Sequence, residues 1–206
     1  MHLTTSWDAA VGALGGVPGG GTALEQAYGQ GSRSYHDTTH VLQVLRDSAQ
    51  LAAALPERAQ AHVALAALAH DVVYDGRPGD DERASADWAR TVLGRQQVPE
   101  ADIDEVVRLV LATIDHRCDP EDAAAVALMD ADLAILGATH EEYDGYVARV
   151  RAEYAVFDDA TWVRGRSAVL GDLLGHEHLY LSPAARVRWE QPARANLTRE
   201  LRSYQV

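Results

Sequence analysis

Lysine is absent from this chain of 206 residues, so arginine supplies all 18 basic side chains. The absence of lysine excludes Schiff-base chemistry, a P-loop lysine and a Ser/Lys dyad. Cysteine occurs once, as Cys118, and no disulfide can therefore form within the chain. A single cysteine is typical of a protein in a reducing compartment.

Basic charge is also scarce overall. The 31 aspartates and glutamates outnumber the arginines and give a net charge of -13. A surface of this sign repels the phosphate backbone that drives nucleic-acid binding, so we expect no nucleic-acid polymer as a partner. A small phosphorylated substrate remains compatible with the sequence, because local arginines or a metal ion can bind it.

Long apolar runs are missing as well. No segment approaches the roughly 20 apolar residues of a membrane-spanning helix. The N-terminal region has no basic segment followed by an apolar run, and the glycines between Gly15 and Gly21 would break the helix of a signal peptide. We therefore expect no membrane partner and a cytoplasmic location.

Strand patterns are nearly absent, whereas apolar residues recur with helical spacing. The spacing predicts helices over about 41–52, 63–71, 81–96, 99–116, 123–136, 161–174 and 184–202, and the second of these is apolar nearly all round and should be central. Asp119 is expected to cap the helix of residues 123–136, with Pro120 in its first turn, and Thr139 with Glu142 forms a capping box for another helix. The sequence predicts an all-α chain of eight or nine helices in one domain over residues 1–206.

Histidines and aspartates occur at three places in this helical pattern. His36 and His40 are four residues apart and would share a face if both lie in a helix. His70 and Asp71 end the apolar central helix, where an ionisable pair is costly to bury unless it is paired or binds a metal.

Asp130 and Asp132 interrupt a later apolar helix. Residues two apart point about 200° away from each other, so at most one of these carboxylates readily faces a common point with the histidines. Imidazole and carboxylate ligands converging from three helices suit Mn, Fe, Ni, Co or Zn.

The order of these residues resembles that of the HD superfamily of metal-dependent phosphohydrolases, and in particular a bacterial group predicted to have that activity. The segments that carry the resemblance are Ser34-Tyr35-His36 leading to His40, His70-Asp71-Val72-Val73-Tyr74-Asp75, residues 81–86, residues 130–137 and, toward the C-terminus, residues 151–154, Gly165-Arg166 and residues 190–197. The resemblance covers the chain from about Trp7 onward and implies a single HD-type helical bundle. Asp37 departs from it, because an amide is expected after His36.

The resemblance implies a metal site made by His40, His70, Asp71 and one aspartate of the later pair. Asp132 is favoured because it stands in an Ala-Asp step followed by apolar residues, and Asp130 is the alternative. We expect one divalent transition metal ion, and Mg is also compatible.

Other side chains are candidates for the remaining steps of a phosphate hydrolysis. Asp75, Glu82 and His116 are candidates for proton transfer, and His116 alternatively for a phosphate contact. Arg33, Arg151 and Arg166 are candidates for binding the substrate phosphate. His36 is either a further substrate contact or a partner that orients a metal ligand.

The expected function is hydrolysis of a small phosphorylated substrate, a nucleotide phosphomonoester or phosphodiester, by metal-activated water. Two alternatives stay open. An HD-type di-iron oxygenase generally has two further histidines between the His-Asp pair and the last aspartate, and here only His116 lies there. A metal-containing module that binds nucleotides without turnover would use the same ligands. The sequence also leaves a homodimer open.

Overall fold

The structure is a computed structural model, and it describes residues 2–29 and 33–205. Helices and turns make up these residues, and no strand occurs among them, so the all-α class is confirmed. The chain divides into two compact units, residues 1–131 and 132–206. The expectation of one domain over residues 1–206 stays a prediction.

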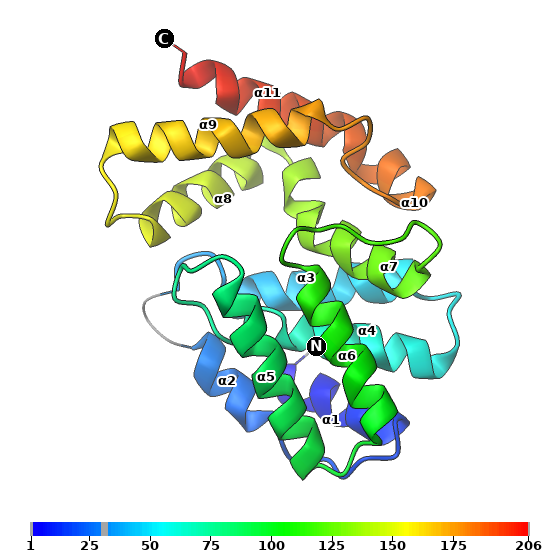
Figure 1. The fold of residues 1–206 in the computed structure, drawn as a ribbon. Helices are drawn as coiled ribbons and strands as arrows, with labels where there is room; N and C mark the ends of the chain where they lie inside the picture. The colour runs from blue at the N-terminus through cyan, green and yellow to red at the C-terminus, as the bar shows by residue number, and fades with distance from the viewer. Residues whose placement is uncertain (1, 30–32, 206) are drawn as a thin grey trace. The chain divides into compact units, whose positions relative to one another are not determined.

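The first unit is built around one apolar helix, α4. The helix α4 packs against α1, α3, α5 and α6, and its residues from Leu65 to Ala69 are completely buried. All five side chains are leucine or alanine and none is charged, as expected for the predicted central helix. The helices of this unit are α1 (Leu3–Ala13), α2 (Thr22–Tyr28), α3 (Thr38–Leu51), α4 (Glu57–Ala69), α5 (Asp80–Arg95), α6 (Glu100–Ala112) and α7 (Ala123–Asp132) (Figure 1).

The second unit is organised around the C-terminal helix α11, which packs against η1 and α9. Figure 1 shows α9 and α11 side by side. Buried Asn196 of α11 donates hydrogen bonds of 2.9 Å to the carbonyls of Leu136 and Ala138, and these bonds tie α11 to the end of η1. The elements are η1 (Leu133–Gly137), α8 (His140–Glu153), α9 (Asp159–Gly175), α10 (Pro183–Ala185), η2 (Arg186–Glu190) and α11 (Gln191–Ser203).

Capping residues explain where several helices begin. The predicted capping box at α8 is confirmed, because Thr139 and Glu142 each accept a hydrogen bond from the other's backbone N–H. Asp158 caps α9, and Ser182 caps α10 with Pro183 in its first turn.

The predicted start of α7 was wrong. Asp122, not Asp119, accepts the hydrogen bond from the backbone N–H of Ala125, and Pro120 lies in a turn before the helix. Asp119 instead accepts from the N–H of Glu121 and stabilises that turn. The predicted helix of residues 123–136 also changes character at Leu133, where the tighter 3₁₀ helix η1 begins.

No single helix within residues 2–29 and 33–205 is long and apolar enough to cross a membrane. The segments Ala123–Gly137 and His140–Glu153 meet the length and composition criteria as a pair, but they are bent by 104°.

Candidate metal centre

The first turn of α3 positions His40. The Asp37 carboxylate accepts hydrogen bonds from the backbone N–H groups of Thr39 and His40, at 2.7 and 3.2 Å. Asp37 is therefore the N-cap of α3, which explains the aspartate that departs from the family pattern. His36 precedes the helix, so the two histidines do not share a helical face, although their ring centroids lie 5.5 Å apart.

The end of α4 places His70 and Asp71 beside His40. The Nε2 atoms of His40 and His70 are 3.3 Å apart. Asp71 Oδ2 lies 3.4 Å from the first of these nitrogens and 3.2 Å from the second. The three electron-pair donors thus form a nearly equilateral triangle, which we call the donor triangle.

A hydrogen bond on the far side of its ring orients His70. The Nδ1 atom lies 2.9 Å from the carbonyl oxygen of Ala67, one turn earlier in α4. A carbonyl accepts but does not donate, so Nδ1 carries a proton, and Nε2, which faces the donor triangle, is the nitrogen that can bind a metal once its own proton has left. This arrangement is typical of a metal-binding imidazole.

The last residue of α7 supplies a fourth donor. His40, His70 and Asp132 each offer one ligand atom, and these atoms all lie within 4.8 Å of one another. Asp130 is buried in the same helix but does not belong to this group. The geometry therefore supports Asp132 over Asp130.

The dimensions of the donor triangle fit a divalent cation. Ligands about 2.1 Å from a metal are separated by roughly 3.0 Å in octahedral and roughly 3.4 Å in tetrahedral coordination. The observed separations of 3.2 to 3.4 Å fall in this range. Two imidazole nitrogens and a carboxylate oxygen suit a transition metal ion, and a possible metal site with His40, His70 and Asp132 is a finding of the structure.

The electrostatics of the triangle favour a charged carboxylate. Burial acts to raise the pKa of Asp71, but the charge of His70 and hydrogen bonds from the His40 and His70 side chains hold that pKa well below its ordinary value. Asp71 is therefore ionised at neutral pH, as a metal ligand must be.

Arg33 is buried beside the segments that carry these ligands. Its guanidinium donates hydrogen bonds to the backbone carbonyls of His36, Asp71 and Val72, at 3.1, 2.6 and 2.8 Å. The predicted role of Arg33 in phosphate binding gains no support from this position. The arginine instead holds together the two segments that carry the metal ligands.

His36 is held at the edge of the site by an aromatic contact. Its ring stacks on Tyr74, with centroids 4.0 Å apart and planes inclined by 24°. The residue is only partly buried. The sequence did not indicate the roles of Tyr74 and of the Ala67 carbonyl. Tyr74 lies in a motif that the sequence shows, but its stacking on His36 depends on how the loop folds.

The three predicted proton-transfer residues occupy different settings. Asp75 is exposed in the loop after α4, and its backbone N–H donates to the buried carboxylate of Asp81. Glu82 accepts a hydrogen bond from the N–H of Gly79 and thereby caps α5. His116 is half-buried after α6, with a left-handed backbone at φ 52°. The roles of these three residues stay predictions.

Arg151 and Arg166 form hydrogen bonds and ion pairs within the chain. Arg151 donates to the carbonyls of Tyr154 and Phe157 and pairs with Asp159 at 2.8 Å. Buried Arg166 binds both carboxylate oxygens of Glu200, at 2.8 and 3.0 Å. Their assignment to the substrate phosphate gains no support.

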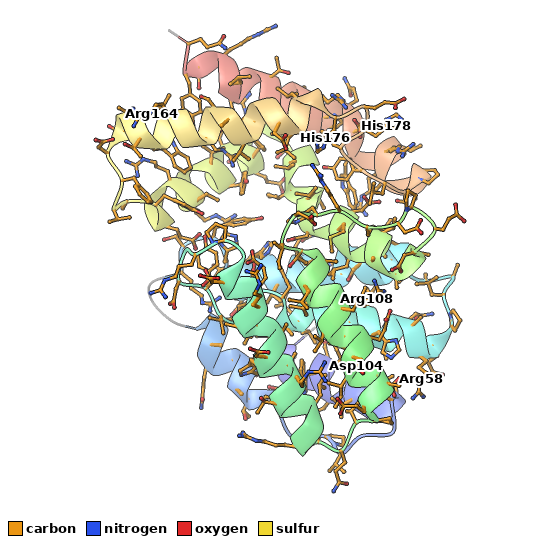
Figure 2. The ribbon with its side chains drawn as sticks, viewed as in Figure 1. Arg58, Asp104, Arg108, Arg164, His176 and His178 are labelled. Carbon is orange, nitrogen blue, oxygen red and sulfur yellow. The ribbon has the colours of Figure 1, made fainter. Side chains whose placement is uncertain are left out.

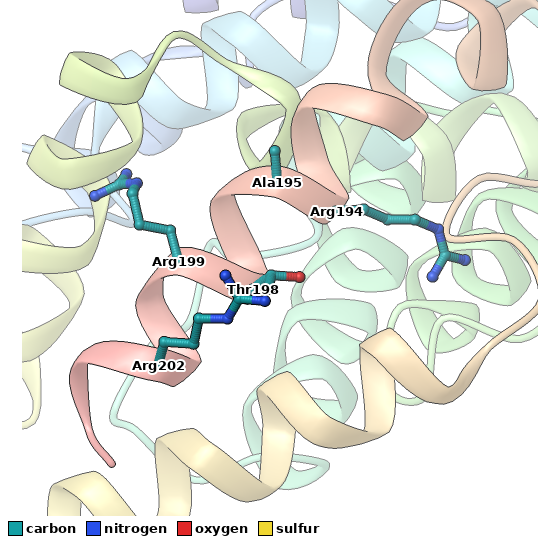
Figure 3. A pocket seen from close by; sticks show the side chains of 5 residues that line it. All are labelled: Arg194, Ala195, Thr198, Arg199 and Arg202. Atoms are coloured by element: carbon teal, nitrogen blue, oxygen red, sulfur yellow. The ribbon is translucent and has the colours of Figure 1, made fainter. Parts of the chain in front are cut away.

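A further arginine group lies along α11 and lines a surface hollow of about 520 Å³ (Figure 3). Arg194 pairs with Glu190, and Arg199 pairs with Asp144. Arg194 also points away from Arg199 and Arg202 in Figure 3. The paired charges and the divergent side chains make this hollow a poor phosphate site.

Comparison with known proteins identifies the family. The HD domain family matches residues 38–142, a region that contains all four candidate metal ligands. Searches of the curated proteins and of the solved structures found no significant match. The HD domain family includes metal-dependent phosphohydrolases. From the family match and the donor geometry, we conclude that this chain belongs to the HD domain family.

Proposed function

We propose that the protein hydrolyses a small phosphorylated substrate, a nucleotide phosphomonoester or phosphodiester, with one divalent transition metal ion. The observation that carries this proposal is the donor triangle, because two imidazole nitrogens and a carboxylate within 3.4 Å of one another suit a cation. Asp132 is the fourth ligand. A metal ion bound there lowers the pKa of water and polarises a phosphoryl oxygen.

The side chains around the ligands have separate tasks in this proposal. His36 contacts the substrate phosphate with its ring, which the Tyr74 stack orients. Asp75 exchanges protons with the leaving oxygen, since its carboxylate follows the ligand segment and is exposed. Glu82 and His116 are the alternatives for this transfer.

The chemical setting supports a small substrate. The net charge of -13 disfavours a polyanion as long as nucleic acid, whereas a metal ion and His36 supply positive charge at one point. We propose a cytoplasmic location on the basis of the single cysteine, and a homodimer remains compatible with it.

The experiment that tests this function is a hydrolysis assay with nucleoside monophosphates, cyclic nucleotides and the simple ester p-nitrophenyl phosphate, in the presence of Mn²⁺, Ni²⁺ or Co²⁺. We expect activity that His70→Ala abolishes. His36→Gln should raise KM by about tenfold and change kcat less, because it removes a substrate contact but no metal ligand.

Nucleotide binding, iron content and oxygen consumption, measured beside hydrolysis, separate the two alternative functions. Nucleotide binding without turnover by any of the metal forms would indicate a binding module. Two irons per chain and oxygen consumption would indicate an oxygenase. Either result contradicts the proposed hydrolysis.

A further inference from the structure

A pocket of about 390 Å³ lies in the second unit, within residues 150–169. Its volume falls in the range of small-molecule sites, which is about 300 to 1,000 Å³. It lies outside the region matched by the HD domain family and shares no residue with the metal ligands. Its lining residues are Val150, Tyr154, Phe157, Thr161, Trp162, Gly165, Arg166 and Val169.

Aromatic rings form one side of this pocket. The rings of Tyr154 and Phe157 stack with centroids 6.2 Å apart, and Tyr154 lies 5.8 Å from Trp162. Phe157 and Val169 are 46% and 51% exposed, although both are large apolar side chains. Such side chains are ordinarily buried, and their exposure around a hollow indicates a surface that binds an apolar group.

The aromatic side is held in place by Arg151. This arginine donates hydrogen bonds of 2.9 and 3.1 Å to the carbonyls of Tyr154 and Phe157. Its guanidinium also lies 5.6 Å from the ring centroid of Trp162. The loop between α8 and α9 is therefore fixed, so a ligand would not have to order it.

A polar group with a balanced charge completes the lining. Arg166 is 8% exposed, and its ion pair with Glu200 neutralises its charge. Its terminal nitrogen donates to the Tyr146 hydroxyl at 3.2 Å, and a guanidinium has five N–H groups in all. Arg166 thus lines the pocket with N–H groups beyond those that bind Glu200 and Tyr146, and its paired charge adds no net attraction for anions.

We propose that this pocket binds an uncharged, flat aromatic compound that carries a carbonyl oxygen. The ring of the compound packs against the aromatic side chains of the lining, and its carbonyl accepts a hydrogen bond from Arg166. The site does not depend on the metal centre or on the proposed hydrolysis.

Three isosteric probes test this chemistry on the full chain. Benzamide is flat, uncharged and has the carbonyl; benzoate adds a charge; cyclohexanecarboxamide loses the flat ring. We expect benzamide to bind with a dissociation constant on the order of 1 mM, and the other two at least about tenfold more weakly. The measurement is the shift of the Trp162 indole N–H resonance in ¹⁵N-labelled protein, assigned with Trp162→Phe.

Two glycines of α9 provide a matched pair of variants. A Cβ atom placed on Gly165 or on Gly171 meets no atom within 4 Å, so the backbone at both positions leaves room for a side chain to begin. Only Gly165 lines the pocket. Gly165→Leu should abolish benzamide binding, whereas Gly171→Leu should leave it unchanged, and both variants should be at least as stable as the parent, because leucine favours a helix more than glycine does.

Several outcomes would overturn the proposal. They are the absence of saturable benzamide binding, equal binding of benzoate, and benzamide binding that survives Gly165→Leu. Self-association that only Gly165→Leu disrupts, without benzamide binding, would assign the surface to a second copy of the chain and also overturn it. Loss of the hydrolytic activity would not affect the result, because the assay needs no metal.

Discussion

At the scale of single residues, Arg33 contributes to the metal centre without contacting a ligand side chain. It donates to the carbonyl of Asp71, which is a candidate ligand, and to the carbonyl of His36, which lies in the segment leading to His40. These partners indicate a structural role for Arg33, because buried backbone carbonyls need a hydrogen-bond donor and the guanidinium supplies it. Sequence order alone gives Arg33 a place near the site but not this set of partners.

Arg33→Met should weaken metal binding by about tenfold and lower the free energy of unfolding by about 2 to 3 kcal/mol, since it leaves buried carbonyls unpaired. The measurements are metal titration and chemical denaturation. Arg95→Met, at an exposed position in the last turn of α5, is the control and should change neither quantity. Equal effects of the two variants would contradict the positioning role.

The buried carboxylate of Asp102 stabilises the fold through its charged partners. Its carboxylate, which is 3% exposed, lies 2.8 Å from His62 Nε2 and accepts two hydrogen bonds from Arg58, labelled in Figure 2. Burial acts to raise the pKa of Asp102, but the hydrogen bonds from His62 and Arg58 outweigh it and hold the pKa below its ordinary value.

Because the pKa of Asp102 is lower in the folded than in the unfolded protein, its stabilisation is fully present above about pH 4 and is lost as the pH falls through the folded pKa. Asp102→Asn should cost about 1 to 3 kcal/mol at pH 7 and flatten the acid limb of the stability curve. Asp104→Asn, at the exposed pair with Arg90, should cost less than about 1 kcal/mol. An unchanged acid limb in Asp102→Asn would refute this assignment.

At the scale of the helices, sequence spacing predicted the order of the long helices from α3 onward, but it missed α1 and α2 and did not give all of the helix ends. The central position of α4 follows from the alanines and leucines of residues 65–69, because they make the helix apolar on every face and such a helix is buried. The start of α7 did not follow, because Asp119 and Asp122 are equally good capping residues and tertiary packing decides between them. The π-helical turn η2 likewise has no local signature in the sequence.

The contact between η1 and η2 requires a residue without a side chain at position 137, which is Gly137. A Cβ atom on Gly137 would lie 2.6 Å from Cβ of Trp189 and 2.9 Å from the Trp189 carbonyl oxygen. Backbone atoms cannot yield to such an approach as a flexible side chain can, so glycine is required there for packing.

Gly137→Ala should therefore lower the free energy of unfolding by about 1 to 3 kcal/mol. Gly145→Ala is the matched control in α8, where a Cβ atom meets nothing within 4 Å and where alanine should stabilise the helix by about 0.5 to 1 kcal/mol. Denaturant titration of both variants measures these opposite effects. A neutral Gly137→Ala would show that η1 and η2 can separate without cost.

At the scale of the whole molecule, the candidate site joins residues that are far apart in the sequence. His40, His70 and Asp132 were predictable as ligands because the motif order resembles that of one family, and the structure brings them within 4.8 Å. The ion pairs that Arg151 and Arg166 form within the chain were not predictable. Because the chain has no lysine, arginine must serve both in ion pairs and in substrate binding, and the sequence does not tell the two uses apart. The distinction requires the folded contacts of each guanidinium.

The most direct test of this account is the metal content of protein purified without chelators and equilibrated with Mn²⁺, Ni²⁺ or Co²⁺. We predict about one ion per chain, loss of that ion in His70→Ala, and its retention in His140→Ala, which removes an exposed histidine at the start of α8. Circular dichroism of His70→Ala should confirm that its helices persist. A chain that binds no ion, or a folded His70→Ala that keeps its full metal content, would contradict the assignment of His40, His70, Asp71 and Asp132 as the metal centre.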